Sequence, residues 1–123
     1  LIDFKLINKF IKITFKKKPD IITNVFERSF PKGQSIELIK SSTFLKNQKK
    51  FKINKDKEHI TTYFYRNFKK FKIMSIKNKK DYSNLNMSVD TQSDINKIRL
   101  IFKKIYKKKK YIPWKKLTKY FNE

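Results

Sequence analysis

The amino-acid sequence predicts an α+β fold whose elements follow in the order strand, helix, strand, strand, helix, strand. Three observations lead to this prediction. Apolar and charged residues alternate near the start of the chain, apolar residues recur at helical spacing after residue 19, and a second helical stripe follows residue 91. With 123 residues, of which 38% are hydrophobic, the chain can bury one modest core, so we expect a single domain over residues 1–123.

The first half of the pattern covers residues 1–39. Ile2, Phe4 and Leu6 alternate with polar residues, as do the apolar residues at 11, 13 and 15, which indicates a strand within residues 1–16. Pro19 is favourable at a first helical position, and the apolar residues at 21, 22, 25, 26 and 30 follow it at helical spacing. We therefore expect a helix from residue 19 to near residue 31 and a second strand at 35–39.

A basic segment separates the second strand from the third. Six Lys lie within twelve residues between positions 46 and 57, which is too much charge for a buried element. We therefore expect residues 43–62 to form a projecting basic loop. Residues 63–76 then mix aromatic and β-branched residues with Lys, a composition typical of a long, half-exposed strand.

The last part of the pattern begins with a polar stretch at 77–90, rich in turn-forming residues, which we interpret as a surface insertion. Ile95, Ile98 and Ile101 then form a helical stripe, and residues 91–94 resemble a capping box at its start. Residues 111–114 predict a short final strand, on a sheet edge because Pro113 has no N–H to donate.

This order of elements is that of the ferredoxin-like βαββαβ unit. In that fold a four-stranded antiparallel sheet carries two helices on one face. The sequence therefore predicts a ferredoxin-like domain with a long basic loop between its second and third strands.

The composition argues against most enzyme chemistry. The chain has no Cys and one His, so it cannot build a thiol nucleophile or a Cys-based zinc site. Its acidic residues are scattered singly, and its single Gly excludes a phosphate-binding GxxxxGK loop. We therefore expect no enzymatic activity, no catalytic residue, no metal site and no small-molecule substrate. No apolar run is long enough for a transmembrane segment.

The charge indicates a polyanionic partner. The chain carries 33 Lys and Arg against 10 Asp and Glu, a formal net charge of +23, and RNA is a common cellular partner for such a chain. Basic residues lie in the predicted loop, in the following strand and at the end of the last helix. The residues predicted to contact RNA are Lys46, Lys49, Lys50, Lys52, Lys55, Lys57, His59, Arg66, Lys107, Lys108, Lys109 and Lys110.

Several segments resemble the S-ten family of small-subunit ribosomal proteins. They are the opening segment 2–6, residues 43–47, the Lys-rich segment 49–65 and the Thr91-led helix at 91–101. Segment 36–39 matches the family's second strand only weakly. The family's Gly-Pro before that strand and its Ser-Pro-His in the loop are both absent.

The resemblance implies a structural protein in the head of the small ribosomal subunit, and it also implies that no cofactor is bound. Its partners would be ribosomal RNA and neighbouring small-subunit proteins. The divergent sequence favours a mitochondrial matrix ribosome, or that of another organelle. One alternative is a basic peripheral subunit of another organellar complex, docked on an acidic protein or a membrane surface. Another is a lineage-specific ribosomal protein with a different fold.

Overall fold

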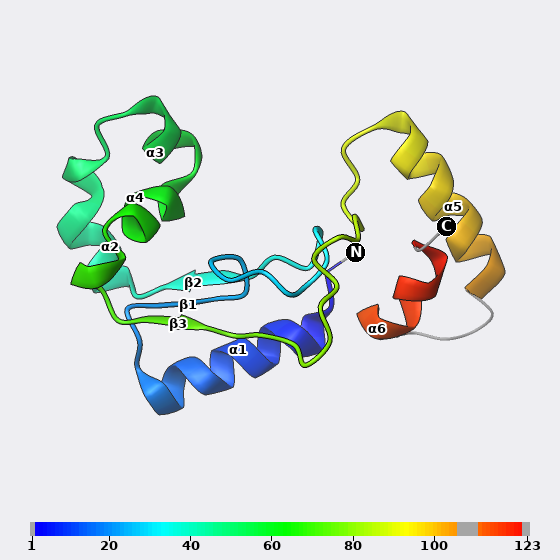
Figure 1. Ribbon diagram of the computed structural model, residues 1–123, viewed down its shortest axis with the longest axis horizontal. Helices are drawn as coiled ribbons and strands as arrows, with labels where there is room; N and C mark the ends of the chain where they lie inside the picture. The colour runs from blue at the N-terminus through cyan, green and yellow to red at the C-terminus, as the bar shows by residue number, and fades with distance from the viewer. Residues whose placement is uncertain (1, 106–110, 122–123) are drawn as a thin grey trace.

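The computed structural model describes residues 2–105 and 111–121, which form a small sheet with helices on both faces and at both ends (Figure 1). The elements, in chain order, are α1 (Phe4–Lys17), β1 (Ile21–Thr23), β2 (Glu37–Ile39), α2 (Ser41–Asn47), α3 (Asn54–Glu58), α4 (Ile60–Arg66), β3 (Ile73–Ser75), α5 (Gln92–Ile105) and α6 (Trp114–Leu117). Short 3₁₀ turns at Gln48–Lys50, Phe68–Lys70 and Thr118–Tyr120 extend α2, α4 and α6.

The sheet has the strand order β2-β1-β3. Strand β1 pairs with β2 in antiparallel fashion and with β3 in parallel fashion, so the sheet is mixed. Alternate residues of the strands face opposite layers. Ile22, Leu38 and Met74 share a core with α1, whereas Ile21, Ile39 and Ile73 pack with Tyr63 and Phe64 of α4.

The predicted ferredoxin-like fold is therefore wrong. The described residues form a three-stranded mixed sheet and six α-helices, not a four-stranded antiparallel sheet with two helices. The segments expected to form the first and last strands are helical or irregular. The long strand expected at 63–76 begins instead with the end of α4 and a 3₁₀ turn, and only β3 at Ile73–Ser75 is a strand. Three parts of the predicted order keep their expected secondary structure: the strand around residues 35–39, the end of the strand at 63–76, where β3 lies, and the helix after residue 91.

Residues 1–16 illustrate how the pattern misled. Instead of a strand, residues 4–16 form most of α1. The helix begins after Asp3, whose side chain caps it by accepting from the N–H groups of Lys5 and Leu6. Leu6 and Phe10 are buried one turn apart against the sheet. The apolar positions satisfy both a period of two and a helical period, and the cap decides between them.

The helix predicted from residue 19 is also wrong. Residues 21–23 form the central strand β1, in which all three side chains are buried. A strand covered on both faces needs a continuous apolar run rather than alternation, so its sequence can imitate a helix. Residues 24–36 then form a long loop, which returns to the sheet through β2 within the predicted strand 35–39.

The segment predicted to be a basic loop is largely helical. Residues 43–62 cover most of α2, all of α3 and the start of α4. With the rest of α4 and the turn at 68–70 they form a helical lobe, residues 41–70, which projects from one end of the sheet (Figure 1). A core of Phe51, Tyr63, Phe64 and Phe71 holds this lobe, so Tyr63 and Phe64, which were expected in a strand, pack instead from α4 against the sheet.

The C-terminal lobe, residues 92–105 and 111–121, stands at the other end of the sheet (Figure 1). The predicted helix is confirmed as α5, and so is its capping box: Asp94 N–H donates to Thr91 Oγ1 at 3.2 Å, and Thr91 N–H donates to Asp94 Oδ2 at 2.8 Å. The predicted edge strand at 111–114 is wrong, because Pro113 instead precedes the first turn of α6.

The stretch 77–90 is irregular, as expected, but it is not only surface. Leu85 and Met87 are buried, and Met87 packs with Ile101 and Leu117 of the C-terminal lobe. Among the described residues no helix is long and apolar enough to cross a membrane. That residues 1–123 make a single domain, and that 77–90 is an insertion, stay predictions.

Candidate functional site

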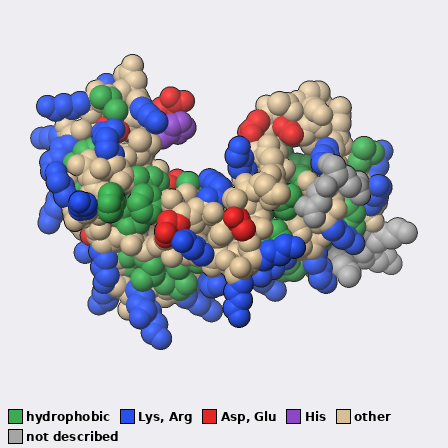
Figure 2. All heavy atoms as spheres, viewed as in Figure 1, with side chains coloured by type: hydrophobic (Ala, Val, Ile, Leu, Met, Phe, Trp, Pro, Cys, Tyr) green, Lys and Arg blue, Asp and Glu red, His purple; other side chains and the backbone are tan. Residues whose placement is uncertain are grey.

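The carboxyl ends of the parallel strands β1 and β3 lie at the same edge of the sheet. In open α/β sheets this edge is where ligands bind, because loops leaving neighbouring strands diverge there and leave a crevice. Here the loop 24–36 follows β1 and runs between the two lobes (Figure 1), and Figure 2 shows a hollow above it, between the helical lobe and the C-terminal lobe. This hollow is the candidate functional site.

The loop 24–36 is held in one shape by the fully buried Asn24. Its Nδ2 donates to the carbonyl oxygen of Gln34 at 2.7 Å, and its Oδ1 accepts from the N–H of Ile36 at 2.8 Å. The amide thus bridges the two ends of the loop, as a strand partner would, and satisfies buried backbone groups. The loop can therefore present its polar side chains in fixed positions.

An ion pair joins the segments that follow β1 and β3. Lys77 Nζ lies 2.9 Å from Glu27 Oε1, and both side chains are exposed. The hydrogen bond from Lys77 lowers the pKa of Glu27 below its ordinary value, which favours the ionised carboxylate. An exposed pair of this kind adds little stability, but it sets two opposite charges at the ligand-binding edge.

Arg28 is the cation of the loop best suited to an anionic ligand. It lies between Asn24 and Gly33, and its side chain is half-buried. Its Nη1 donates to Ser35 Oγ at 3.2 Å, a neutral partner, so its positive charge is not neutralised by an acid there. A guanidinium presents several N–H donors in a plane, which suits a phosphate or a carboxylate.

Tyr65 of α4 connects the helical lobe to the sheet at the same edge. Its hydroxyl donates to the Glu37 carboxylate and lies 3.0 Å from Thr23 Oγ1. Burial, together with the Glu37 carboxylate, raises the pKa of Tyr65 far above its ordinary value, so the hydroxyl remains a donor. Phe26 stacks on the Tyr65 ring with centroids 4.9 Å apart, so the loop is fixed to α4 as well.

Replacing Tyr65 with Phe should therefore loosen this junction without creating a cavity. We expect the free energy of unfolding to fall by about 1–2 kcal/mol, because the hydroxyl contacts with Glu37 and Thr23 are lost together. Urea denaturation followed by circular dichroism measures this. Tyr120→Phe is the matched control. An equal loss in both variants would show that the Tyr65 contacts contribute nothing specific.

Acidic side chains lie on both walls of the hollow (Figure 2). The single histidine of the chain, purple in Figure 2, lies on the wall formed by the helical lobe, and its Nε2 is 3.9 Å from Glu58 Oε1. On the other wall the start of α5 carries acids, and Asp90 Oδ2 accepts from Ser88 Oγ at 2.6 Å. Among the described residues no group of three or more His, Asp or Glu side chains could hold a metal ion.

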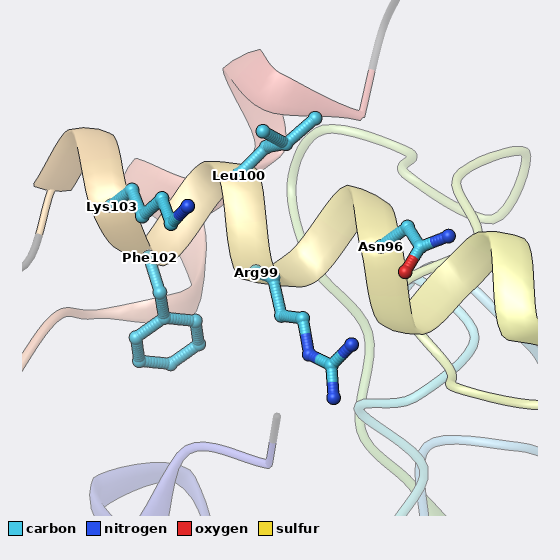
Figure 3. A pocket seen from close by; sticks show the side chains of 5 residues that line it. All are labelled: Asn96, Arg99, Leu100, Phe102 and Lys103. Atoms are coloured by element: carbon cyan, nitrogen blue, oxygen red, sulfur yellow. The ribbon is translucent and has the colours of Figure 1, made fainter.

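A second depression lies along α5, away from the sheet edge (Figure 3). Leu100 points to one side of the helix, while Arg99 and Phe102 point to another (Figure 3). It is open and mainly apolar, whereas a site for a polar reaction needs several polar groups directed at one point. The hollow at the carboxyl edge is favoured instead because charged side chains, Glu27, Arg28 and Lys77, lie in the segments that follow β1 and β3.

Of the residues predicted to bind RNA, His59 lies on a wall of the candidate site, and the other described ones have no part in the site as it is built above. Those of the segment 46–57 are exposed on the helical lobe, and Lys50 Nζ donates to Asn47 Oδ1 at 3.0 Å. Arg66 forms an ion pair of 2.7 Å with the buried Asp56, which gives it a structural partner. His59 precedes α4, and Lys107–Lys110 lie outside the described residues. That these residues contact an anion stays a prediction.

Sequence reasoning missed the residues that the sheet brings together, namely Glu27, Arg28, Glu37, Tyr65 and Lys77. They are spread over fifty positions, and no charge run marks them. A usable signal was present in the loop itself, because Asn24, Pro31 and the only Gly of the chain lie within ten residues. That density of turn-forming residues indicates a shaped loop rather than a helix.

The fold has a clear counterpart among solved structures. The chain is similar to a cytidylyltransferase from Leptospira borgpetersenii serovar Hardjo-bovis, with a TM-score of 0.86 and 25% sequence identity. The similarity covers 96% of this chain and 50% of that protein, so the chain spans half the length of the structure it matches. No protein-family model matches the chain, and no curated protein does.

This similarity overturns the predictions based on the resemblance to the S-ten family. A ribosomal role in the subunit head, with ribosomal RNA and small-subunit proteins as partners, has no support, and neither has the alternative of a basic peripheral subunit. The expectations of no enzyme and no small-molecule substrate are also contradicted, since the matched protein is an enzyme named for a nucleotide. The mitochondrial location stays a prediction.

Proposed function

We propose that this chain forms part of a nucleotidyltransferase and that the hollow at the carboxyl ends of β1 and β3 belongs to its substrate site. The observation that carries the proposal is the similarity to a cytidylyltransferase over 96% of the chain. Since the chain spans half of that protein, the activity belongs to the whole enzyme, to which this fold contributes. The position of the hollow supports the proposal independently, because ligands of α/β sheets bind at this edge.

The reaction is the transfer of a nucleotidyl group. A nucleophilic oxygen of the acceptor attacks the α-phosphorus of a nucleoside triphosphate, by analogy CTP, and the bond to the β-phosphate oxygen breaks. Pyrophosphate leaves, and the acceptor oxygen loses its proton if it carried one. Such a step needs positive charge near the phosphates and a fixed acceptor rather than a covalent intermediate.

The loop 24–36 can supply part of both requirements. Arg28 offers guanidinium donors to an anionic group, and Asn24 fixes the backbone that carries it. Because the chain has one Gly, it cannot form a glycine-rich phosphate loop, so a loop of that kind would have to come from the remainder of the enzyme. We therefore assign to this chain the part of the site around the acceptor or the reacting phosphate.

Pyrophosphate release by the native protein tests the proposal. With CTP and a panel of acceptors that carry hydroxyl, carboxylate or phosphate groups, we expect release with CTP above that with other nucleoside triphosphates. Arg28→Ala should lower kcat/KM by about 10- to 100-fold, because a charge-assisted hydrogen bond contributes about 1.5–3 kcal/mol. Arg28→Lys should retain part of the rate.

The matched control is Lys12→Ala, which removes one exposed positive charge from α1, distant from the hollow. Its rate should equal that of the parent protein. If the native protein neither binds CTP in calorimetry nor releases pyrophosphate with any acceptor, the proposed function is wrong. If Lys12→Ala and Arg28→Ala lose the same activity, the assignment of Arg28 to the site is wrong.

A further inference from the structure

Helix α1 carries apolar side chains on two sides. Leu6 and Phe10 point into the core under the sheet, as an amphipathic helix requires. On another flank Phe4, Ile11 and Phe15 recur at intervals of seven and four residues and are 53%, 38% and 76% exposed. This outer stripe of α1, defined by these three residues, lies along one line of the helix surface, since seven residues make about two turns.

The outer stripe is more than the usual scatter of exposed apolar residues. Single exposed apolar side chains are normal, but an aligned row on one helix marks a surface that packs against something. Phe4 already has a partial partner, because its ring lies edge-on to Tyr111 with centroids 4.9 Å apart. Toward the end of the helix the described residues leave Phe15 most exposed.

The sheet is open on the β2 side. Lys40 N–H donates to the Asp20 carbonyl at 2.8 Å and Asn24 N–H donates to the Ile36 carbonyl at 3.2 Å, so the even-numbered residues near β2 bond toward β1. The backbone groups of Glu37 and Ile39 therefore point to the other side, where no strand of the described chain lies. On the opposite edge Ile73 N–H is already bonded to the Phe71 carbonyl at 3.0 Å.

We propose that two surfaces of this chain, the outer stripe of α1 and the open β2 edge, receive the other half of a nucleotidyltransferase-like fold. The occupant is a polypeptide segment equivalent to the half of the Leptospira cytidylyltransferase that this chain does not match. The inference rests on the proposed function. The structural similarity covers 96% of this chain but only half of the Leptospira protein. Surfaces that are apolar or unpaired in this chain are therefore the places where the rest of such a fold can pack.

Photo-crosslinking in the source cells tests this surface in the native protein. A benzophenone amino acid is placed at Ile11 or Phe15 and, as the matched control, at Lys9, which is exposed on a different side of α1. We expect the first two positions to crosslink to a peptide whose sequence aligns with the unmatched half of the Leptospira protein, on the same polypeptide or a separate one. Lys9 should give no such product.

A crosslink to a second copy of residues 1–123, to an unrelated protein, or to nothing would overturn the proposal. The double variant Ile11→Lys with Phe15→Lys gives a second measurement. Both side chains are exposed, so the far-UV circular dichroism spectrum should be unchanged. A benzophenone amino acid placed at Phe4 of this double variant should no longer crosslink to the aligned segment. Neither measurement requires enzymatic turnover. If the protein is inactive but still crosslinks as expected, the proposed function is wrong while the inference about this surface stands.

Discussion

Replacing Gly33 with alanine is expected to give the largest loss of stability of any single substitution considered for this chain. Gly33 has φ = +86°, which L-residues with a side chain rarely adopt. A Cβ built at this position would lie 2.6 Å from both the carbonyl carbon and the oxygen of Met87, and 2.7 Å from the nitrogen of Ser88. These neighbours are backbone atoms, so no side-chain rotation can relieve the contact.

The contact cannot open cheaply because hydrogen bonds hold both segments. Lys32 N–H donates to the Leu85 carbonyl at 3.0 Å, and Met87 N–H donates to the Lys32 carbonyl at 2.9 Å. Separating them would also disturb Met87, which is fully buried against the C-terminal lobe. With about 1–2 kcal/mol from the positive φ and the clash added, we expect a loss of more than about 3 kcal/mol.

A thermal melt of Gly33→Ala should therefore shift downward by more than about 10 °C, since about 1 kcal/mol corresponds to roughly 4 °C in a domain of this size. Lys32→Ala is the control in the same loop, because its exposed side chain contributes none of the backbone bonds to residues 85 and 87. That control should melt like the parent. A Gly33→Ala variant that melts within about 2 °C of the parent would show that the two segments do not meet as described.

The elements that the sequence predicted correctly are those whose stabilising contacts lie between residues close in sequence. For α5 the cap at Thr91 and Asp94 and the stripe of Ile95, Ile98 and Ile101 all lie within eleven residues. The strand at 35–39 is likewise bounded by turn-forming residues close in sequence. Where the signal was ambiguous, as in α1, the N-cap Asp3 would have decided for a helix, but the alternation of apolar residues outweighed it.

The rest depends on pairings that are distant in sequence. Strand β1 has only three residues and is a strand because it pairs with β2, sixteen positions later, and with β3, fifty-two positions later. The candidate site shares this dependence, because Lys77 reaches Glu27 only through the parallel pairing of β1 with β3. The prediction of RNA binding was based largely on the dense Lys run of the helical lobe. Charge density alone, however, does not show which groups the fold brings together.

Removing the Asp3 carboxylate is expected to give the second large loss of stability, because it connects the start of α1 with the segment that leads into α6. One carboxylate caps α1, accepts from the Tyr111 hydroxyl at 2.8 Å and accepts from the Trp114 N–H at 3.1 Å. The Trp114 ring in turn lies against Phe30, with centroids 5.4 Å apart, in the core that α1 covers. Asp3 is almost fully buried, so removing its carboxylate would leave its partners without an acceptor in a place that water does not reach.

Asp3→Ala should therefore lower the free energy of unfolding by about 2–4 kcal/mol. About 1 kcal/mol comes from the lost N-cap and about 1–3 kcal/mol from leaving the Trp114 N–H buried without a partner. Asp3→Asn should lose less, because the amide oxygen can still cap the helix. Urea denaturation measures both, and Asp81→Ala, which removes an exposed carboxylate in a turn, is the matched control. Equal losses for Asp3→Ala and Asp81→Ala would contradict this role.

The same carboxylate should make stability depend on pH. Burial acts to raise the pKa of Asp3, but the hydrogen bonds from Trp114, Tyr111 and the first turn of α1 outweigh it and hold the pKa below the ordinary 3.8. Because the unfolded chain then binds the proton more readily, the stabilisation is complete above the unfolded pKa and is lost as the pH falls through the folded one. The difference in unfolding free energy between the parent and Asp3→Asn should therefore shrink from pH 6 toward pH 3, and a difference that stays constant over this range would show that the charge of Asp3 does not stabilise the fold.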